Sequence, residues 1–131
     1  MTSIPHTAVA TDQAPAAIGP YSQAVKAGGF VYVSGQLPID PALGRIEAEG
    51  AGDQAAQSID NIEAILRAAG LGLADVVKTT VLLADIGDFA IVNQVYASRF
   101  ATVPMPARAA FQVVALPMGA LVEIEAVAYA G

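Results

Sequence analysis

The chain has 131 residues, of which 55% are hydrophobic and 14% are charged, and its formal net charge is −6. It contains no cysteine and one histidine, His6, which excludes disulfides, thiolate nucleophiles, cysteine-bound metals and histidine-cluster metal sites within one chain. No apolar run approaches the roughly 20 residues that a membrane-spanning helix requires. Met1–Ala10 has neither the basic start nor the apolar core of an export signal, so we expect no membrane association and a cytoplasmic location.

The six basic residues are scattered along the chain, and none adjoins another. Nucleic-acid-binding proteins carry a basic patch that replaces the counterions of the phosphates, so the acidic net charge argues against a nucleic-acid partner. The apolar surplus is large for a chain of this length. We therefore expect part of the hydrophobic surface to be covered by another subunit.

Prolines dominate the start of the chain. Residues 1–20 contain three of them and predict a loop that leads into a sheet, with residues 1–10 flexible. Tyr21 follows this loop, where an aromatic residue at a strand entrance commonly packs against the sheet.

The next segment predicts a β-hairpin. Gly28-Gly29 separates two β-prone runs, Gln23–Ala27 and Phe30–Ser34, and glycine readily adopts the positive φ of a two-residue turn. Ser34 ends the second run, where serine commonly caps a strand. Leu37–Asp40 predicts a further short strand before a turn at residues 41–44.

Two amphipathic helices are expected. In the first, from Asp53 onward, apolar residues recur every three or four positions until Gly70, a natural C-terminal cap, and Glu63 and Arg67 can pair one turn apart. The members of this stripe are Ala56, Ile59, Ile62, Leu66 and Ala69. Asp88 is a plausible N-cap for the second helix, Phe89–Ala101. The stripe of this second helix is Phe89, Val92, Tyr96 and Phe100.

Between the helices, Val76–Ala84 is apolar on both faces and predicts a central strand that is covered on both sides. Asn93 lies in the second helix, where an exposed asparagine is commonplace. Thr102–Pro106 holds two prolines and predicts a loop.

The segment Pro106–Glu125 combines charges with an apolar context. Two β-prone runs flank a Pro-Met-Gly turn and predict an antiparallel hairpin. Arg108 precedes the first run, and Glu123 and Glu125 share one face of the second. Charges in an apolar hairpin are costly unless each has a partner or a function. Two interpretations are open for Arg108: an ion pair with Glu123 or Glu125, or a binding site for a small carboxylate.

The order of elements is hairpin, helix, strand, helix, hairpin, without a linker or an internal repeat. This order favours an α+β sandwich in which two helices pack on one face of a mixed sheet, formed by one domain over residues 1–131.

Several dispersed motifs resemble the Rid (YjgF) family, some of whose members were described as endoribonucleases or translation inhibitors. They are residues 14–24, 33–38, 57–61 and 77–81, and Pro-Ala-Arg at 106–108 followed by Glu-Ile-Glu at 123–125. The likeness runs from about Thr11 to Ala128. It implies a chorismate-mutase-like fold, a homotrimer with clefts between its subunits, and a small imino or enamine acid as substrate.

The resemblance also implies a site. Arg108 would bind the substrate carboxylate, Glu123 would position and activate water, and Tyr21 and Ser34 would complete the pocket. The main chain of Ala110 would contribute polar groups, and Asn93 would hydrogen-bond at an interface near the substrate. The reaction implied is hydrolytic deamination of 2-imino acids to 2-oxo acids and ammonia, without a cofactor or a metal.

One residue departs from the family pattern. Ala110 stands where relatives often have cysteine, which excludes a thiol-based mechanism and leaves the substrate open. A second possibility is therefore another deaminase of the same superfamily, acting on aminoacrylate derivatives or 2-aminomuconate. A third is a non-enzymatic protein that binds small carboxylates or has a regulatory role.

Overall fold

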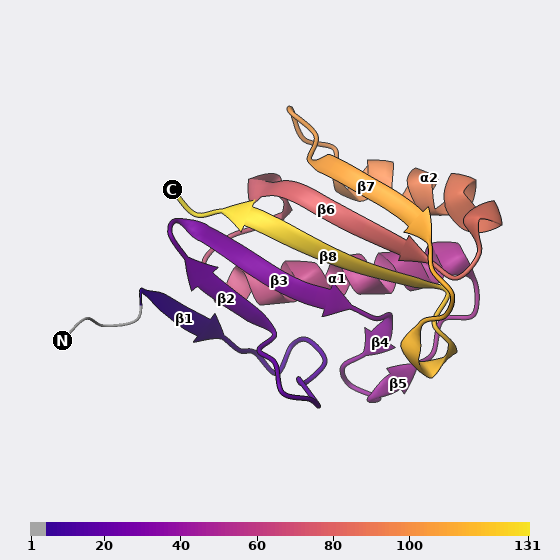
Figure 1. Cartoon of the computed structure of the whole chain (residues 1–131), viewed down its shortest axis with the longest axis horizontal. Coiled ribbons are helices and arrows are strands. Elements are labelled where there is room, and N and C mark those ends of the chain that lie inside the picture. Colours follow the sequence, from indigo (N-terminus) through magenta and orange to yellow (C-terminus); the bar gives the residue numbers. More distant parts are fainter. Residues whose placement is uncertain (1–4) are drawn as a thin grey trace.

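A computed structural model describes residues 5–131 (Figure 1). The strands are β1 (His6–Val9), β2 (Ala24–Ala27), β3 (Phe30–Gln36), β4 (Ile39–Asp40), β5 (Arg45–Ile46), β6 (Val76–Leu83), β7 (Ala107–Gln112) and β8 (Val122–Tyr129). The helices are α1 (Ala51–Ala68) and α2 (Phe89–Arg99), and short 3-10 turns cover Leu73–Asp75, Ile86–Asp88 and Pro117–Gly119. No helix within residues 5–131 is long and apolar enough to cross a lipid bilayer.

Six strands form one sheet in the order β1-β2-β3-β8-β6-β7, and β4 and β5 form a separate two-stranded ribbon. The pair β6–β7 is parallel and every other pair in the large sheet is antiparallel. Both helices cover the same face of the sheet (Figure 1). The predicted mixed sheet with two helices on one face is thereby confirmed, and the homotrimer stays a prediction.

The predicted hairpin of β7 and β8 is wrong. The strand β6 lies between them, parallel to β7 and antiparallel to β8. The segment 113–121 connects β7 to β8, and both of its ends are hydrogen-bonded to the C-terminal end of β6. Val113 N–H donates to Leu83 O, and Ala84 N–H donates to Leu121 O. A connection of this length does not fix the register of a hairpin, so β6 can insert between the two strands.

The N-terminal interpretation also needs a correction. Residues 6–9 form the edge strand β1, which pairs with β2, so residues 1–20 are not all loop. The expected flexibility of residues 1–10 falls partly on Met1–Ile4, which lie outside the described residues. The hairpin of β2 and β3 is confirmed, with Gly28 and Gly29 at φ values of 58° and 83°.

Helix α1 buries one side against the sheet and ends as its sequence predicts. Gly70 has a φ of +78°, and Leu71 N–H donates to Leu66 O at 2.8 Å, which satisfies a carbonyl in the last turn. Arg67 lies 3.6 Å from Glu63, so the predicted pair forms. In addition, Arg99 of α2 reaches the carboxylates of Asp60 and Glu63 at 2.8 and 3.4 Å, which ties the two helices together.

The second predicted helix is confirmed, and its N-cap residue is the predicted one, although the expected capping hydrogen bond does not form. Asp88 occupies the N-cap position of α2 without a side-chain hydrogen bond. The carboxylate of Asp85 instead accepts from Gly87 N–H at 2.8 Å, in the 3-10 turn before the helix.

The face of the sheet away from the helices is open within the chain. Along β8, alternate residues are buried under the helices, and Glu123, Glu125 and Tyr129 point to the open face. The prediction that β6 is covered on both sides is therefore wrong for a single chain. Tyr32, Phe111 and Tyr129 are each about half exposed on this face, at 49, 48 and 51%.

Candidate active site

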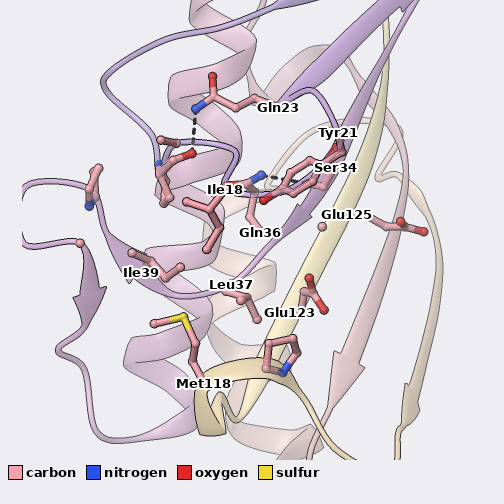
Figure 2. A pocket seen from close by; sticks show the side chains of 16 residues that line it. Ile18, Tyr21, Gln23, Ser34, Gln36, Leu37, Ile39, Met118, Glu123 and Glu125 are labelled. Carbon is pink, nitrogen blue, oxygen red and sulfur yellow. Dashed lines mark hydrogen bonds between the residues drawn. The ribbon is translucent and has the colours of Figure 1, made fainter.

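A cavity of about 760 Å³ lies where β3 and β8 meet the loop 15–21 and the 3-10 turn 117–119 (Figure 2). It brings together Tyr21, Ser34 and Glu123, three of the residues that the sequence singles out. The wall facing these polar groups is apolar. Its members are Ile18, Leu37, Ile39 and Met118. Such a lining, apolar with a few convergent polar groups, is typical of a small-molecule site.

A β-bulge shapes the polar side of this cavity. Between Val33 and Gln36 of β3, the register to β8 shifts by one residue, so Ser34 and Gly35 bulge out of the ladder. Ser34 Oγ donates to Ser22 O at 2.6 Å, which fixes the hydroxyl hydrogen and leaves the oxygen of this lining residue able to accept a hydrogen bond.

Gly35 lets the Glu123 carboxylate approach the bulge closely. A Cβ atom at this position would lie 2.6 Å from Glu123 Oε2, closer than real Cβ atoms come, and 3.1 Å from its carboxyl carbon, which is also tight. The requirement for glycine is space, because Gly35 is not among the glycines with a positive φ. No local pattern in the sequence predicts this role for Gly35, because a glycine at a strand end can serve many purposes.

Burial raises the pKa of the Glu123 carboxyl above its usual value, and the negative charge of Glu125 raises it further. No arginine or lysine pairs with Glu123 in the described part of the chain. Glu125 is exposed at the rim of the same cavity. A carboxyl whose pKa is raised is a stronger proton acceptor than an ordinary glutamate, which suits general acid–base chemistry on water.

Tyr21 is about half exposed (52%) over the cavity mouth. Its loop is held by Gln23, a buried residue whose role no local pattern in the sequence predicts. Gln23 Nε2 donates to the carbonyl oxygens of Thr11 and Pro15 at 3.0 and 2.8 Å, and Gln23 Oε1 accepts from Thr11 N–H at 2.7 Å. Since these contacts are long-range in sequence, no local pattern could have identified them.

Met118 is the one non-glycine residue with a positive φ (59°) in residues 5–131. This conformation is strained for a side chain with a Cβ atom and is concentrated at functional sites. Here it directs the Met118 side chain toward the apolar wall of the cavity (Figure 2).

Arg108 lies elsewhere. Its Nη1 donates to Asn93 Oδ1 of α2 at 2.7 Å, and its guanidinium carbon lies 5.4 Å from the Phe89 ring centroid and 4.8 Å from that of Tyr96. Within residues 5–131 no carboxylate forms a salt bridge with Arg108, so the ion pair with Glu123 or Glu125 does not form within the chain. The guanidinium is held by neutral partners, which leaves its charge available to an anion.

The sheet separates Arg108 from Glu123. Arg108 is in register with Thr79 of β6, whose hydroxyl points to α2, whereas Glu123 is in register with Leu82. Thr79 and Leu82 are three residues apart and face opposite sides of the strand. Arg108 and Ala110 therefore lie on the helix face of β7, and Glu123 lies on the open face of β8. One chain does not bring these groups together.

The comparisons with known proteins agree with the motifs. The family model described as "Endoribonuclease L-PSP" matches residues 11–130. A curated 2-iminobutanoate/2-iminopropanoate deaminase from Bos taurus is 53% identical over 131 residues, which is 100% of this chain and 95% of the relative. The chain belongs to the Rid family.

Two solved Rid-family structures show the same fold. RidA from an Antarctic Psychrobacter has a TM-score of 0.88 at 52% identity, and the match covers 94% of this chain and 98% of that one. Escherichia coli TdcF with bound serine has a TM-score of 0.88 at 42% identity, covering 95% and 99%.

The structure gathers the family motifs in two places. Segments 14–24, 33–38 and 123–125 contribute lining residues to the cavity. The segment 106–108 lies across the sheet, on the edge strand β7, paired with the segment 77–81 of β6. An edge strand leaves part of its backbone N–H and C=O groups unpaired. No cluster of three or more potential metal ligands occurs in the described residues.

Replacement of Gly35 by alanine tests the close approach of Glu123. The new methyl group would displace the carboxylate by about 1 Å, and a misplacement of this size lowers an enzymatic rate by roughly 100-fold. We expect Gly35→Ala to lose imine-hydrolysing activity on that scale while retaining the circular dichroism spectrum of the wild type.

Gly72→Ala is the matched control, because a Cβ atom there meets nothing within 4 Å. Its activity should equal that of the wild type. Full activity in Gly35→Ala would show that the position of the carboxylate does not depend on this glycine.

The raised pKa of Glu123 predicts a pH-dependent stability. Since the pKa of this carboxyl is higher in the folded than in the unfolded chain, its contribution is fully present below the unfolded value of about 4.3 and is lost as the pH rises through the folded pKa. Glu123→Gln should therefore unfold at a higher urea concentration than the wild type at pH 7 and at an equal one near pH 4. Glu125→Gln should give a smaller gain, and equal midpoints at both pH values would contradict the shift.

Proposed function

We propose that this protein deaminates short-chain 2-imino and enamine acids by hydrolysis, releasing 2-oxo acids and ammonia. The observation that carries the proposal is the 53% identity over the whole chain to a curated 2-iminobutanoate/2-iminopropanoate deaminase. The cavity supports it independently, because it presents a carboxyl of raised pKa beside a hydroxyl and an apolar wall.

The proposed chemistry is an addition followed by an elimination. The guanidinium of Arg108 binds the substrate carboxylate through both of its oxygens. Water adds to the imine carbon, and Glu123 accepts a proton from that water. Glu123 passes that proton to the nitrogen, which gives a tetrahedral intermediate with a hydroxyl and an amino group. Glu123 then relays the hydroxyl proton to the amino group, and the C–N bond breaks as the C=O bond forms, releasing ammonia and the 2-oxo acid. Tyr21 and Ser34 hold the ligand in place, and the main chain around Ala110 supplies further hydrogen-bonding groups.

We further propose that the site lies between copies of the chain in a homotrimer. Arg108 with Asn93 would come from one copy, and Tyr21, Ser34 and Glu123 from its neighbour. The opposite placement of Arg108 and Glu123 across the sheet supports this arrangement. The open sheet face, with its half-exposed aromatic side chains, provides apolar surface for the contact.

A second candidate is another deaminase activity of the same superfamily, acting on aminoacrylate derivatives or 2-aminomuconate. Ala110 favours it, because its side chain is smaller than the cysteine that relatives often carry there, which leaves more room. A panel of imino and enamino acids with longer and shorter chains distinguishes the two activities by their kcat/KM values.

RNA cleavage, which the family description names, receives little support from the charges. The net charge is −6, and three of the four arginines, Arg45, Arg67 and Arg99, are paired with carboxylates of the same chain. These arginines are therefore neutralised as contacts for phosphate.

The activity is tested by generating 2-iminobutanoate in situ with a threonine dehydratase and following its decay. We expect the wild type to accelerate the decay and Arg108→Ala to reduce kcat/KM by roughly 100-fold, because an interaction with a charged group contributes up to about 3 kcal/mol. Arg108→Lys should retain part of the activity, since lysine keeps the charge without the planar fork.

The control is Arg67→Ala, which removes an arginine at an exposed helix position. It should behave as the wild type does. If Arg108→Ala accelerates the decay as strongly as the wild type, the guanidinium has no role in the reaction.

A further inference from the structure

The guanidinium of Arg108 rests on one stripe of helix α2. Phe89, Asn93 and Tyr96 are spaced four and three residues apart, so their side chains share one face of the helix. Asn93 accepts a hydrogen bond of 2.7 Å from Arg108 Nη1, and the two rings lie 5.4 and 4.8 Å from the guanidinium carbon. The contact with Tyr96 is the closer of the two cation–π contacts.

The ring of Tyr96 is itself held in place by a hydrogen bond to the sheet. Its hydroxyl shares a hydrogen bond of 2.6 Å with Thr79 Oγ1, and both residues are buried, at 4 and 1% exposure. Burial raises the pKa of Tyr96, so the phenol stays protonated at neutral pH. Neither hydroxyl has another side-chain partner in the described residues, and loss of the bond would leave a buried polar group unsatisfied.

Thr79 connects this contact back to the arginine. In the parallel pair of β6 and β7, Thr79 is the register partner of Arg108. The backbone of Arg108 thus pairs with that of Thr79, the Thr79 hydroxyl bonds to Tyr96, and the ring of Tyr96 contacts the Arg108 guanidinium. The flexible Arg108 side chain is therefore restricted both at its backbone and at its guanidinium group.

We infer that Thr79 and Tyr96 are positioning residues, which hold the Arg108 guanidinium in the orientation that receives a substrate carboxylate. The inference rests on the proposed function and adds to it, since neither residue touches the ligand. Ordering the arginine before the ligand arrives lowers the entropy lost on binding. An interaction of this kind acts equally on the ground state and the transition state, so it lowers KM and leaves kcat unchanged.

Steady-state kinetics with in situ 2-iminobutanoate test the inference through four variants. Tyr96→Phe keeps the ring and removes the hydroxyl, and Thr79→Val removes the partner hydroxyl at nearly constant volume. Each should raise KM by about 3- to 10-fold with kcat changed by less than about two-fold, the range that a single hydrogen bond spans. The double variant should be no worse than either single variant, and Thr79→Ser should restore the KM of the wild type.

The matched control is Thr7→Val, which makes the same substitution at an exposed position of the edge strand β1, where the hydroxyl has no hydrogen-bond partner in the described residues. It should retain the KM of the wild type. An unchanged KM in Tyr96→Phe and Thr79→Val overturns the inference, even if both variants unfold at lower temperature. The inference is also overturned if the increase in KM of the double variant equals the product of the increases of the two single variants.

Nuclear magnetic resonance separates a failure of the inference from a failure of the proposed function. The chain has four arginines, so the side-chain Nε–H signal of Arg108 can be identified by its loss in Arg108→Lys. In the wild type this signal should carry a ring-current shift, and in Tyr96→Phe and Thr79→Val it should move toward the signals of the exposed arginines. A signal that does not move in either variant overturns the positioning role. A wild type without deaminase activity, but with these shifts, overturns the proposed function alone.

Discussion

The alternation of side chains across a β-sheet is the constraint on which the arrangement of this molecule depends. It sends Glu123 to the open face and Arg108 to the face that the helices cover. If a carboxylate and a guanidinium of the same chain both faced one ligand, they would pair with each other whenever the ligand is not bound. Separation by the sheet keeps the two charges apart within one chain, as the proposed site between two copies requires.

Each charge has a local environment that suits its proposed task. Arg108 is surrounded by an amide oxygen and two aromatic faces, which restrict the guanidinium without neutralising it. The close contact with Gly35 in the bulge fixes the place of the Glu123 carboxylate. Its partial burial and the charge of the neighbouring Glu125 both disfavour its ionised form. The other arginines pair with carboxylates instead: Arg99 links α2 to α1, Arg67 pairs within α1, and Arg45 pairs with Glu47 just beyond β5.

Local patterns in the sequence predicted the elements well and the long-range pairings poorly. The Gly-Gly turn, the α1 stripe with its Gly70 cap, and the alternation of Glu123 and Glu125 on one face are all local, and the structure has each of them. The insertion of β6 between β7 and β8 is a non-local event that no turn signal encodes. For the site, charge in an apolar context pointed to Arg108, Glu123 and Glu125, and the family resemblance selected Glu123. Gly35 and Gln23 make contacts between distant segments that no local pattern encodes. The stripe of the second helix predicted the place of Tyr96 but not its hydrogen bond to Thr79.

The most direct test of a site shared between copies is complementation. Arg108→Ala and Glu123→Gln chains are refolded together in equal amounts, and native mass spectrometry verifies that mixed oligomers form. Random mixing leaves about a quarter of the shared sites with both an intact Arg108 and an intact Glu123, so the mixture should regain about a quarter of the wild-type activity although each variant alone is inactive. Mixed oligomers that remain as inactive as the separate variants would contradict a site built from two copies.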